Sequence, residues 1–268
     1  MLIDSHCHLD AEAFDHDREE VVNRARQAGV GAMLLPAYSC EHFVRLESVC
    51  QRYSMVDLTL WPAWGIHPCY VKQHNEDDLQ RLEAWVSRSD CVAVGEIGLD
   101  RFLPESREPE VWRKQQHFFR YQLDLANRVG KPVVIHARHS YAELMSALRH
   151  CQVSAGGIIH AYNGPVNVAY TLVDAGFLLG LGGVLTQDSA SRLAALVTRL
   201  PLSAMVLETD APDMLPQALW RQGLRRHEPA WIVEVQARVA ALRGISRGDV
   251  ATATSANVQR CLGKLWLD

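Results

Sequence analysis

Short apolar runs alternate with longer amphipathic segments along nearly the whole chain. Eight of the short runs have the length of buried strands: about residues 2–8, 31–36, 58–66, 91–96, 133–136, 156–160, 176–180 and 204–208. Runs that are apolar on both faces are typical of a parallel sheet covered by helices. The pattern therefore predicts an α/β protein.

The amphipathic segments between these runs predict helices. We expect them at residues 18–28, 40–53, 77–88, 109–129, 141–150, 166–175 and 189–200, with two more at 230–243 and 246–262. Eight successive strand–helix units most simply close into a (β/α)8 TIM barrel, although a doubly wound open sheet has the same pattern. The chain length suits one barrel, so residues 1–268 are expected to form a single domain.

Composition narrows the classes of function. Acidic residues (31) slightly outnumber basic ones (27), so the chain offers no broad basic surface for long duplex nucleic acid. Its seven cysteines are scattered without a Cys-x-x-Cys pair, which suits a reducing compartment and predicts a cytoplasmic protein. No apolar run approaches membrane-spanning length, and no signal peptide precedes the first strand. We therefore expect no membrane association, and no pattern indicates an obligate protein partner.

The first apolar run ends in Asp4-Ser5-His6-Cys7-His8. Because side chains alternate faces along a strand, His6 and His8 are expected on one face, about 7 Å apart, where both imidazoles could bind one metal ion. Cys7 would point the other way and pack in the core. A His-x-His pair alone is a weak signal, so its interpretation depends on ligands elsewhere in the chain.

Polar side chains occur at matching places on other apolar runs. Together with His6 and His8 they are Glu96, His136, His160 and Asp210. Each alone has a simpler explanation, because a strand-end histidine is commonly a hydrogen-bonded rim residue and a strand-end carboxylate commonly caps the next helix. Chemistry in a (β/α)8 barrel collects at the carboxyl ends of the strands. Six such residues at the ends of five strands therefore predict a metal site.

Four imidazoles and two carboxylates are too many ligands for one ion but suffice for two divalent ions that share a carboxylate. Glu96 is the expected bridge. One ion would then be held by His6, His8 and Asp210, and the other by His136 and His160. A water between two cations loses its proton near neutral pH, and Asp210 could also orient that water. Zn2+, Mn2+, Fe2+ and Mg2+ all remain open, although nitrogen-rich sites are less typical of Mg2+.

Two further carboxylates could hold imidazoles in place through their second ring nitrogens. Glu208 lies two residues before Asp210, on the same face of the predicted strand. Asp4 has the same relation to His6. For Asp4, a buried acceptor that only orders the barrel floor is an equally good explanation.

These polar residues belong to longer motifs. The motifs are Asp4-Ser-His-Cys-His-Leu-Asp10, Gly65-Ile-His-Pro68, Gly95-Glu-Ile-Gly-Leu-Asp100, Pro132-Val-Val-Ile-His-Ala-Arg138, His160-Ala-Tyr-Asn-Gly164 and Glu208-Thr-Asp-Ala-Pro212. In this order they resemble the TatD family of metal-dependent DNases, in particular its YjjV-type members, over nearly the whole chain. The resemblance implies an amidohydrolase-type TIM barrel with a two-metal site that hydrolyses phosphodiester bonds in DNA, often from the 3′ end. It also places the family's metal ligands on the same six residues.

Three residues near these ligands are candidates for substrate binding. His67, the Gly-x-His-Pro histidine, could hold a phosphate or protonate the leaving oxygen, or it could be a rim residue. Arg138 could clamp a phosphate oxygen or cap a helix. Arg101 stands where the family usually has an aromatic residue, which leaves open whether a base stacks or a phosphate binds there.

Two other departures from the family's usual residues are expected to line the mouth of the barrel. His227 stands where the family commonly has asparagine, and Tyr162-Asn163 replaces the frequent Phe-Ser. Neither departure changes a predicted ligand. Both could alter which substrate the site prefers.

The residues together predict a hydrolase of phosphodiesters with two divalent metal ions, most simply a DNase of the 3′–5′ exonuclease type. Glu96, Asp210 and His67 would take part in catalysis, and the expected partner is DNA or another phosphodiester. One alternative is a metal-dependent hydrolase of a small cyclic amide or ester, or of a non-nucleic phosphate ester. Many such enzymes bridge their metals with a modified lysine where this chain has Glu96. A non-catalytic metal-binding protein would be expected to lack a ligand, and none is lacking.

Overall fold

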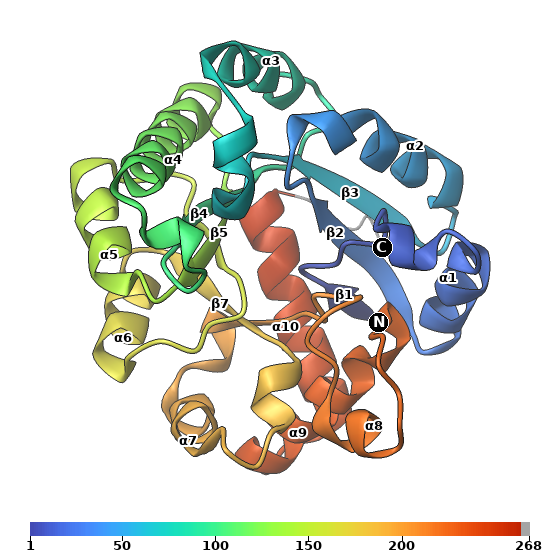
Figure 1. Cartoon of the computed structure of the whole chain (residues 1–268). Helices are drawn as coiled ribbons and strands as arrows, with labels where there is room; N and C mark the ends of the chain where they lie inside the picture. The colour runs from blue at the N-terminus through green and yellow to red at the C-terminus, as the bar shows by residue number, and fades with distance from the viewer. Residues whose placement is uncertain (264–268) are drawn as a thin grey trace.

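The computed structural model describes residues 1–263 and contains a sheet of eight strands in the order β1-β2-β3-β4-β5-β6-β7-β8. The strands are β1 (Leu2–Asp4), β2 (Val30–Pro36), β3 (Thr59–Trp64), β4 (Ala93–Asp100), β5 (Val133–Arg138), β6 (Gly157–Ile159), β7 (Phe177–Leu181) and β8 (Met205–Leu207). Each pairs in parallel with the next, and Figure 1 views them along the barrel. The predicted TIM barrel is confirmed. A doubly wound sheet is excluded, because its strand order would not follow the chain.

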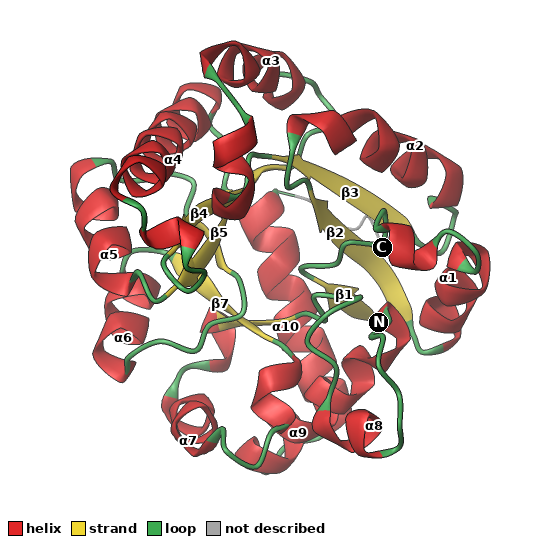
Figure 2. Ribbon diagram, in the orientation of Figure 1, coloured by secondary structure: helices red, strands yellow, loops and turns green. Residues whose placement is uncertain are grey.

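Helices surround the strands, most of them in a ring (Figure 2). They are α1 (Arg18–Gln27), α2 (Phe43–Tyr53), α3 (Glu76–Val86), α4 (Pro109–Val129), α5 (Tyr141–His150), α6 (Val166–Asp174), α7 (Ser191–Arg199), α8 (Gln217–Arg221), α9 (Ile232–Arg243) and α10 (Arg247–Leu262). Short 3-10 helices lie at η1 (Glu12–Phe14), η2 (Cys40–His42), η3 (Pro68–Gln73), η4 (Glu105–Arg107), η5 (Gly183–Thr186), η6 (Leu202–Ala204) and η7 (Pro229–Trp231). In the described residues, no helix is long and apolar enough to cross a membrane.

The apolar residues form two layers. A large cluster lies between the strands and the surrounding helices, with Phe43, Trp64 and Phe118 among its largest buried side chains. A smaller cluster fills the barrel and includes Val258 and Leu262 from α10. Figure 1 shows α10 behind the strands, across the opening of the barrel. This helix therefore closes the end where the strands begin, and the other end is left for loops.

The first and last strands meet at a seam made largely by Asp4. Ser5 N donates to Leu207 O at 2.9 Å, which links the end of β1 to β8. The Asp4 carboxylate accepts from Thr209 Oγ1 at 2.6 Å and from Thr209 N at 3.0 Å. It also accepts from the backbone N of His6 at 3.2 Å. Asp4 is fully buried, so these bonds offset the cost of burying its carboxyl group.

Two strand boundaries differ from the sequence prediction in ways that matter for the site. β1 ends at Asp4 rather than at His8, because the next backbone N–H groups bond in turn to Leu207 and Leu34 instead of forming one ladder. β4 continues to Asp100 rather than ending at Glu96. The histidines of the first motif thus lie on a loop, whereas Glu96 lies inside a strand. α8 and η3 were also not predicted.

Helix termini show how local sequence sets the boundaries. α10 begins with a capping box, in which Ser246 Oγ accepts from Asp249 N at 3.0 Å and Asp249 Oδ2 accepts from Ser246 N at 3.2 Å. Asn75 forms a second capping box with Asp78 at α3. Gly130 ends α4 with φ 66°, a left-handed conformation that glycine adopts readily.

Candidate metal centre

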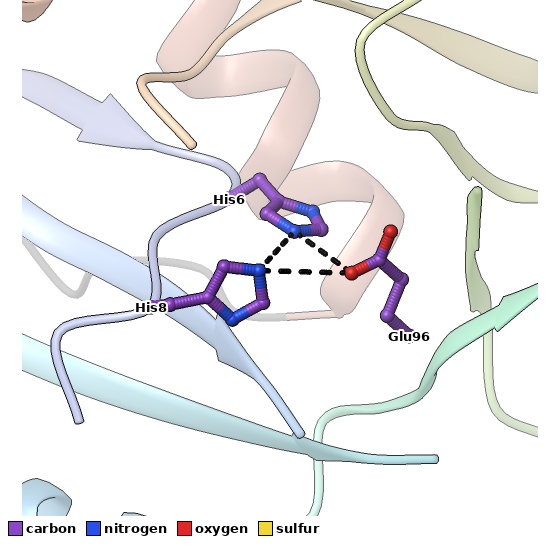
Figure 3. Close-up of side chains that lie close together, drawn as sticks. All are labelled: His6, His8 and Glu96. Atoms are coloured by element: carbon purple, nitrogen blue, oxygen red, sulfur yellow. Dashed lines mark hydrogen bonds and ion pairs between the residues drawn. The ribbon is translucent and has the colours of Figure 1, made fainter. Parts of the chain in front are cut away.

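The structure brings all six predicted ligands together at the carboxyl ends of the strands. They lie on the loop after β1 (His6, His8), inside β4 (Glu96), inside β5 (His136), directly after β6 (His160) and on the loop after β8 (Asp210). Figure 3 shows the imidazoles of His6 and His8 converging on the Glu96 carboxylate. His6 and Glu96 are buried almost completely.

Three donor atoms, from His6, His8 and Glu96, lie close together at one point of this site, and Asp210 lies beside the two histidines. His6 Nε2 lies 3.2 Å from His8 Nε2 and 3.2 Å from Glu96 Oε2. His8 Nε2 lies 3.7 Å from Glu96 Oε2 and 3.4 Å from Asp210 Oδ1, which is 3.6 Å from His6 Nε2. Any two ligands about 2.0–2.1 Å from a tetrahedral Zn2+ would be roughly 3.3 Å apart. The donor types and their spacing therefore fit a divalent cation.

The second carboxylate oxygen of Glu96 faces another pair of histidines. His136 Nδ1 lies 3.2 Å from Glu96 Oε1, and His67 Nε2 lies 3.5 Å from the same atom. These three side chains form a second group that could hold a metal ion. Each oxygen of Glu96 thus belongs to a different group of nitrogen donors.

His160 joins the site from the other side. Its ring stacks on His6 with 3.5 Å between centroids, and its Nε2 lies 3.5 Å from Asp210 Oδ2. Its Nδ1 lies 3.0 Å from Glu208 Oε1, which also accepts from Ala161 N at 2.6 Å. Glu208 therefore lies beside this imidazole, and its role in orienting the ring stays a prediction. Asp4, in contrast, contacts the backbone of His6, and His6 Nδ1 is buried without a hydrogen-bond partner among the described residues.

Glu96 and Asp210 both have lowered pKa values. Burial would raise the pKa of Glu96, but the neighbouring His6, His67 and His136 outweigh burial and hold that pKa well below its usual range. Asp210 behaves in the same way, because His160 and His8 outweigh its burial and lower its pKa. Both groups are therefore carboxylates at neutral pH.

The imidazoles divide into two kinds. Burial lowers the pKa of His67 to about 3, despite the charge of Glu96, so this ring is neutral at pH 7. For His8, burial is outweighed by the hydrogen bond and charge of Asp210, which raise its pKa to about 9. His160 also has a raised pKa, because Glu208 and Asp210 outweigh burial. Protons on these two rings offset the carboxylates, and a divalent cation would displace them on binding.

Local sequence makes room for these side chains. The pairing of β4 with β5 shifts register between Val94 and Ile97, an irregularity of the kind that redirects a side chain, and Glu96 lies within it. At Gly65, a Cβ would lie 2.9 Å from Glu96 N. At Gly180, a Cβ would collide with the Glu208 carboxylate. Glycine at these two positions therefore lets the Glu96 backbone and the Glu208 carboxylate approach closely.

The site opens into a cavity of about 960 Å³ that is lined by Glu96, His136, His160 and Asp210 among others. Four non-glycine residues in the described chain have positive φ: His139, Ala161, Asp210 and Met214. All four line this cavity. Left-handed backbone at non-glycine residues is unfavourable and concentrates at functional sites. The strained backbone therefore indicates a functional site at the same cavity as the clustered side chains.

Asp100 is a residue of the site that the sequence prediction missed. Its Oδ2 lies 2.9 Å from His136 Nε2, on the side of the ring opposite Glu96. Burial would raise its pKa, but His136 outweighs burial and the pKa is lowered. The signal was present in the sequence, because Asp100 lies four residues after Glu96 and therefore on the same face of a strand.

The predicted substrate-binding residues lie in different surroundings. His67 and Arg138 line the cavity. Arg101 instead pairs with Glu143 at 3.1 Å and stacks on Trp112 at 4.7 Å, and the described cavity lining does not include it.

The two departures from the family's usual residues also differ in position. Asn163 lines the cavity as expected. His227 and Tyr162 are buried instead of lining the mouth. The expectation that both departures face substrate was therefore right only for Asn163.

The barrel and its convergent imidazoles and carboxylates define the class of protein, a metal-dependent hydrolase. The family model described as TatD related DNase matches residues 3–263, and the chain belongs to this family. It is 36% identical over 215 residues to the uncharacterized metal-dependent hydrolase YjjV of Escherichia coli, covering 80% of each chain. It is 33% identical over 262 residues to the 3'-5' ssDNA/RNA exonuclease TatD of Cronobacter turicensis, covering 97% of each.

The crystal structure of the TatD homolog YjjV from Escherichia coli K12 has the same fold. It superposes with a TM-score of 0.88 at 32% identity and covers 97% of each chain. The similarity extends over nearly the whole length of both chains. The resemblance noted from the motifs is thus confirmed at the level of the family.

Proposed function

We propose that this chain hydrolyses phosphodiester bonds, most simply in single-stranded DNA from the 3′ end, with two divalent metal ions bound on either side of Glu96. The main support for the proposal is the position of the Glu96 carboxylate between two groups of donors. Its Oε2 faces His6 and His8, and its Oε1 faces His136. A shared carboxylate between two groups of donors suits a two-metal site, and two cations suit a phosphodiester because they can neutralise its phosphate. The relative named as an exonuclease supports the choice of substrate.

His6, His8 and Asp210 would hold one ion and His136 and His160 the other, with Glu96 available to both groups of donors. Bound divalent ions lower the pKa of water and stabilise the charge that develops on the phosphate oxygens. Asp210 remains a carboxylate at neutral pH and can accept a proton from the attacking water. Glu208 and Asp100 hold the rings of His160 and His136 from behind.

His67 has a different role in this proposal. Its Nδ1 accepts a hydrogen bond from Cys69 N at 3.1 Å, so in the neutral ring the proton is on Nε2. With its proton on Nε2, His67 is the poorest metal donor of the group it forms with Glu96 and His136, and this nitrogen can donate a hydrogen bond into the cavity. We therefore assign His67 to hydrogen bonding of a substrate phosphate oxygen, together with Arg138.

All seven cysteines are free thiols in the structure, which supports the proposal of a cytoplasmic enzyme. We also propose that residues 1–268 act as one hydrolase domain. Any one of Zn2+, Mn2+ or Mg2+ could serve as the metal, with the nitrogen donors favouring the first two.

Glu96→Ala tests the proposal. We expect this variant to bind fewer metal ions per chain, measured by elemental analysis, and to lose hydrolysis of a labelled single-stranded oligonucleotide in Mn2+ or Mg2+. The wild type should cleave the oligonucleotide, and a chelator should abolish cleavage. A p-nitrophenyl ester and a dihydropyrimidine serve as parallel substrates. Turnover of the ester or the dihydropyrimidine without nuclease activity would favour the alternative, a hydrolase of esters or cyclic amides. Full activity of Glu96→Ala would contradict the proposed role of Glu96 as a ligand shared by two metal ions.

A further inference from the structure

Above the metal centre, the cavity wall carries an arginine stacked on an aromatic ring. The guanidinium carbon of Arg138 lies 3.4 Å from the centroid of the Phe102 ring, closer than in any other arginine–aromatic pair of the described chain. The imidazole of His139 meets the same ring edge-on, with 5.4 Å between centroids. Phe102 is 40% exposed, so this group lies at the protein surface.

The Arg138 guanidinium faces the cavity without a carboxylate partner among residues 1–263. Arg138 and His139 line the cavity, whereas Phe102 does not, so Phe102 covers the guanidinium from behind. The free face of the guanidinium is then the one turned toward the cavity. Arg101, in the same loop as Phe102, makes a useful contrast because Glu143 already neutralises it.

The loop that carries Phe102 is held in place from both sides. Phe102 N donates to Asp100 Oδ1 at 2.7 Å, and Phe102 O accepts from Arg107 Nη2 at 2.9 Å. The other oxygen of Asp100 contacts His136 in the metal centre. One carboxylate thus holds both the aromatic ring and a predicted metal ligand. The stack is ordered before substrate arrives, which lowers the entropic cost of binding.

We propose that Arg138, held flat by Phe102, is the stacking surface for a nucleobase of a single-stranded substrate; this inference rests on the phosphodiesterase activity proposed above. A planar guanidinium stacks on the π-face of any base, and its N–H groups stay free for a phosphate. Arg138 lies two residues beyond His136, about 7 Å along the strand. The stacked base therefore belongs to the nucleotide beside the reacting phosphate.

Single strands are favoured because a base in a duplex has both faces covered by its neighbours. In this arrangement Arg138 touches the substrate, and Phe102 acts through Arg138 as a positioning residue. Lysine in place of Arg138 keeps the charge but has no flat surface. Charge and stacking can therefore be separated by substitution.

The experiment compares binding of two fluorescein-labelled octamers by fluorescence anisotropy, with the protein as purified with its metal. One is a phosphorothioate octathymidylate, which resists hydrolysis, and the other is the matched octamer of abasic sugars. We expect the wild type to bind the thymidylate on the order of tenfold more tightly than the abasic octamer, because stacking of one base contributes about that much to the affinity. Phe102→Leu and Arg138→Lys should lose most of this preference. Phe102→Trp should retain it, because a flat ring remains under the guanidinium.

Trp220→Leu is the matched control. Trp220 is also exposed (57%) beneath an arginine, with Arg225 at 5.0 Å from its ring, but the described cavity lining does not include it. This variant should keep the wild-type preference. Equal binding of the two octamers by the wild type, or an unchanged preference in Phe102→Leu and Arg138→Lys, would overturn the inference.

Hydrolysis of an unmodified oligonucleotide, measured separately in Mn2+, distinguishes this inference from the proposed function. Cleavage without a base preference would overturn the stacking surface alone. A base preference without cleavage would support the stacking surface and overturn the nuclease activity. Arg138→Lys keeps the positive charge at an exposed position, so its folding is not at risk even if Phe102→Leu is unstable.

Discussion

The two ends of the barrel are built from the same strands but have opposite character. At the end where the strands begin, Val258 and Leu262 of α10 pack into the barrel against apolar strand residues such as Ile3. At the other end, the side chains of Glu96 and Asp210 are ionised and surrounded by imidazoles. The α10 end is therefore closely packed with apolar side chains, whereas the metal-centre end holds carboxylates and imidazoles of opposite charge.

The contrast shows how the fold separates stability from chemistry. Apolar packing at the α10 end holds the strands in register, which allows unfavourable features at the other end. These features include buried carboxylates and the left-handed backbone of Asp210 and Ala161. A substitution at one end should therefore change activity, and a substitution at the other should change the free energy of unfolding.

The largest expected effect is at the metal centre. Asp210→Asn removes a carboxylate that contacts His6, His8 and His160, so we expect kcat/KM for an oligonucleotide to fall on the order of 10³-fold or more. Steady-state cleavage in Mn2+ measures it. Asp213→Asn is the control, because this neighbouring carboxyl also lines the cavity, and its loss should stay below about tenfold. Equal losses in the two variants would contradict the assignment.

A smaller effect is expected at the α10 end. Leu262→Ala deletes a buried side chain that packs into the barrel, and we expect the free energy of unfolding to fall by about 3 kcal/mol. Urea denaturation measures it, with Val44→Ala, at a 61% exposed position, as a control with almost no change. The kcat/KM of folded Leu262→Ala should stay within about twofold of the wild type. A large loss of activity in folded protein would break the separation of the two ends.

The smallest effect concerns pH. Burial lowers the pKa of His227 to about 4, whereas an unfolded histidine titrates near 6.5, so the unfolded chain binds more protons between these values. The contribution of His227 to stability is complete above pH 6.5 and is lost as the pH falls toward 4. Between pH 7.5 and 5 this amounts to about 2 kcal/mol. The free energy of unfolding, measured by urea denaturation in the presence of a chelator, should fall between pH 7.5 and 5 by about 2 kcal/mol less in His227→Asn than in the wild type. Identical pH profiles of the two proteins would contradict the proposed effect of His227 protonation.

The candidate site could be predicted in its members but not in its contacts. All six predicted ligands meet at one end of the barrel, because apolar runs mark the strands and parallel strands carry their carboxyl ends to one edge. The sequence prediction gave His67 a role in catalysis and substrate binding but not in metal binding, and it overlooked Asp100; the structure places these two beside Glu96 and His136. The spacing of Asp100 from Glu96 was a signal for its face of the strand, but the distances depend on how β3, β4 and β5 pair, including the irregular pairing inside β4.

By itself, the sequence determined the eight strand–helix units and the types of polar residue at the carboxyl ends of the strands, and the tertiary structure decided that the strands form a barrel in chain order. Only the tertiary structure decided which atoms face each other. It divided Glu96 between two groups of histidines, turned Arg101 toward Glu143 and stacked Arg138 on Phe102. The physical reason is that these contacts join segments from different strands. Their geometry is set by how the barrel closes and by how each loop leaves its strand.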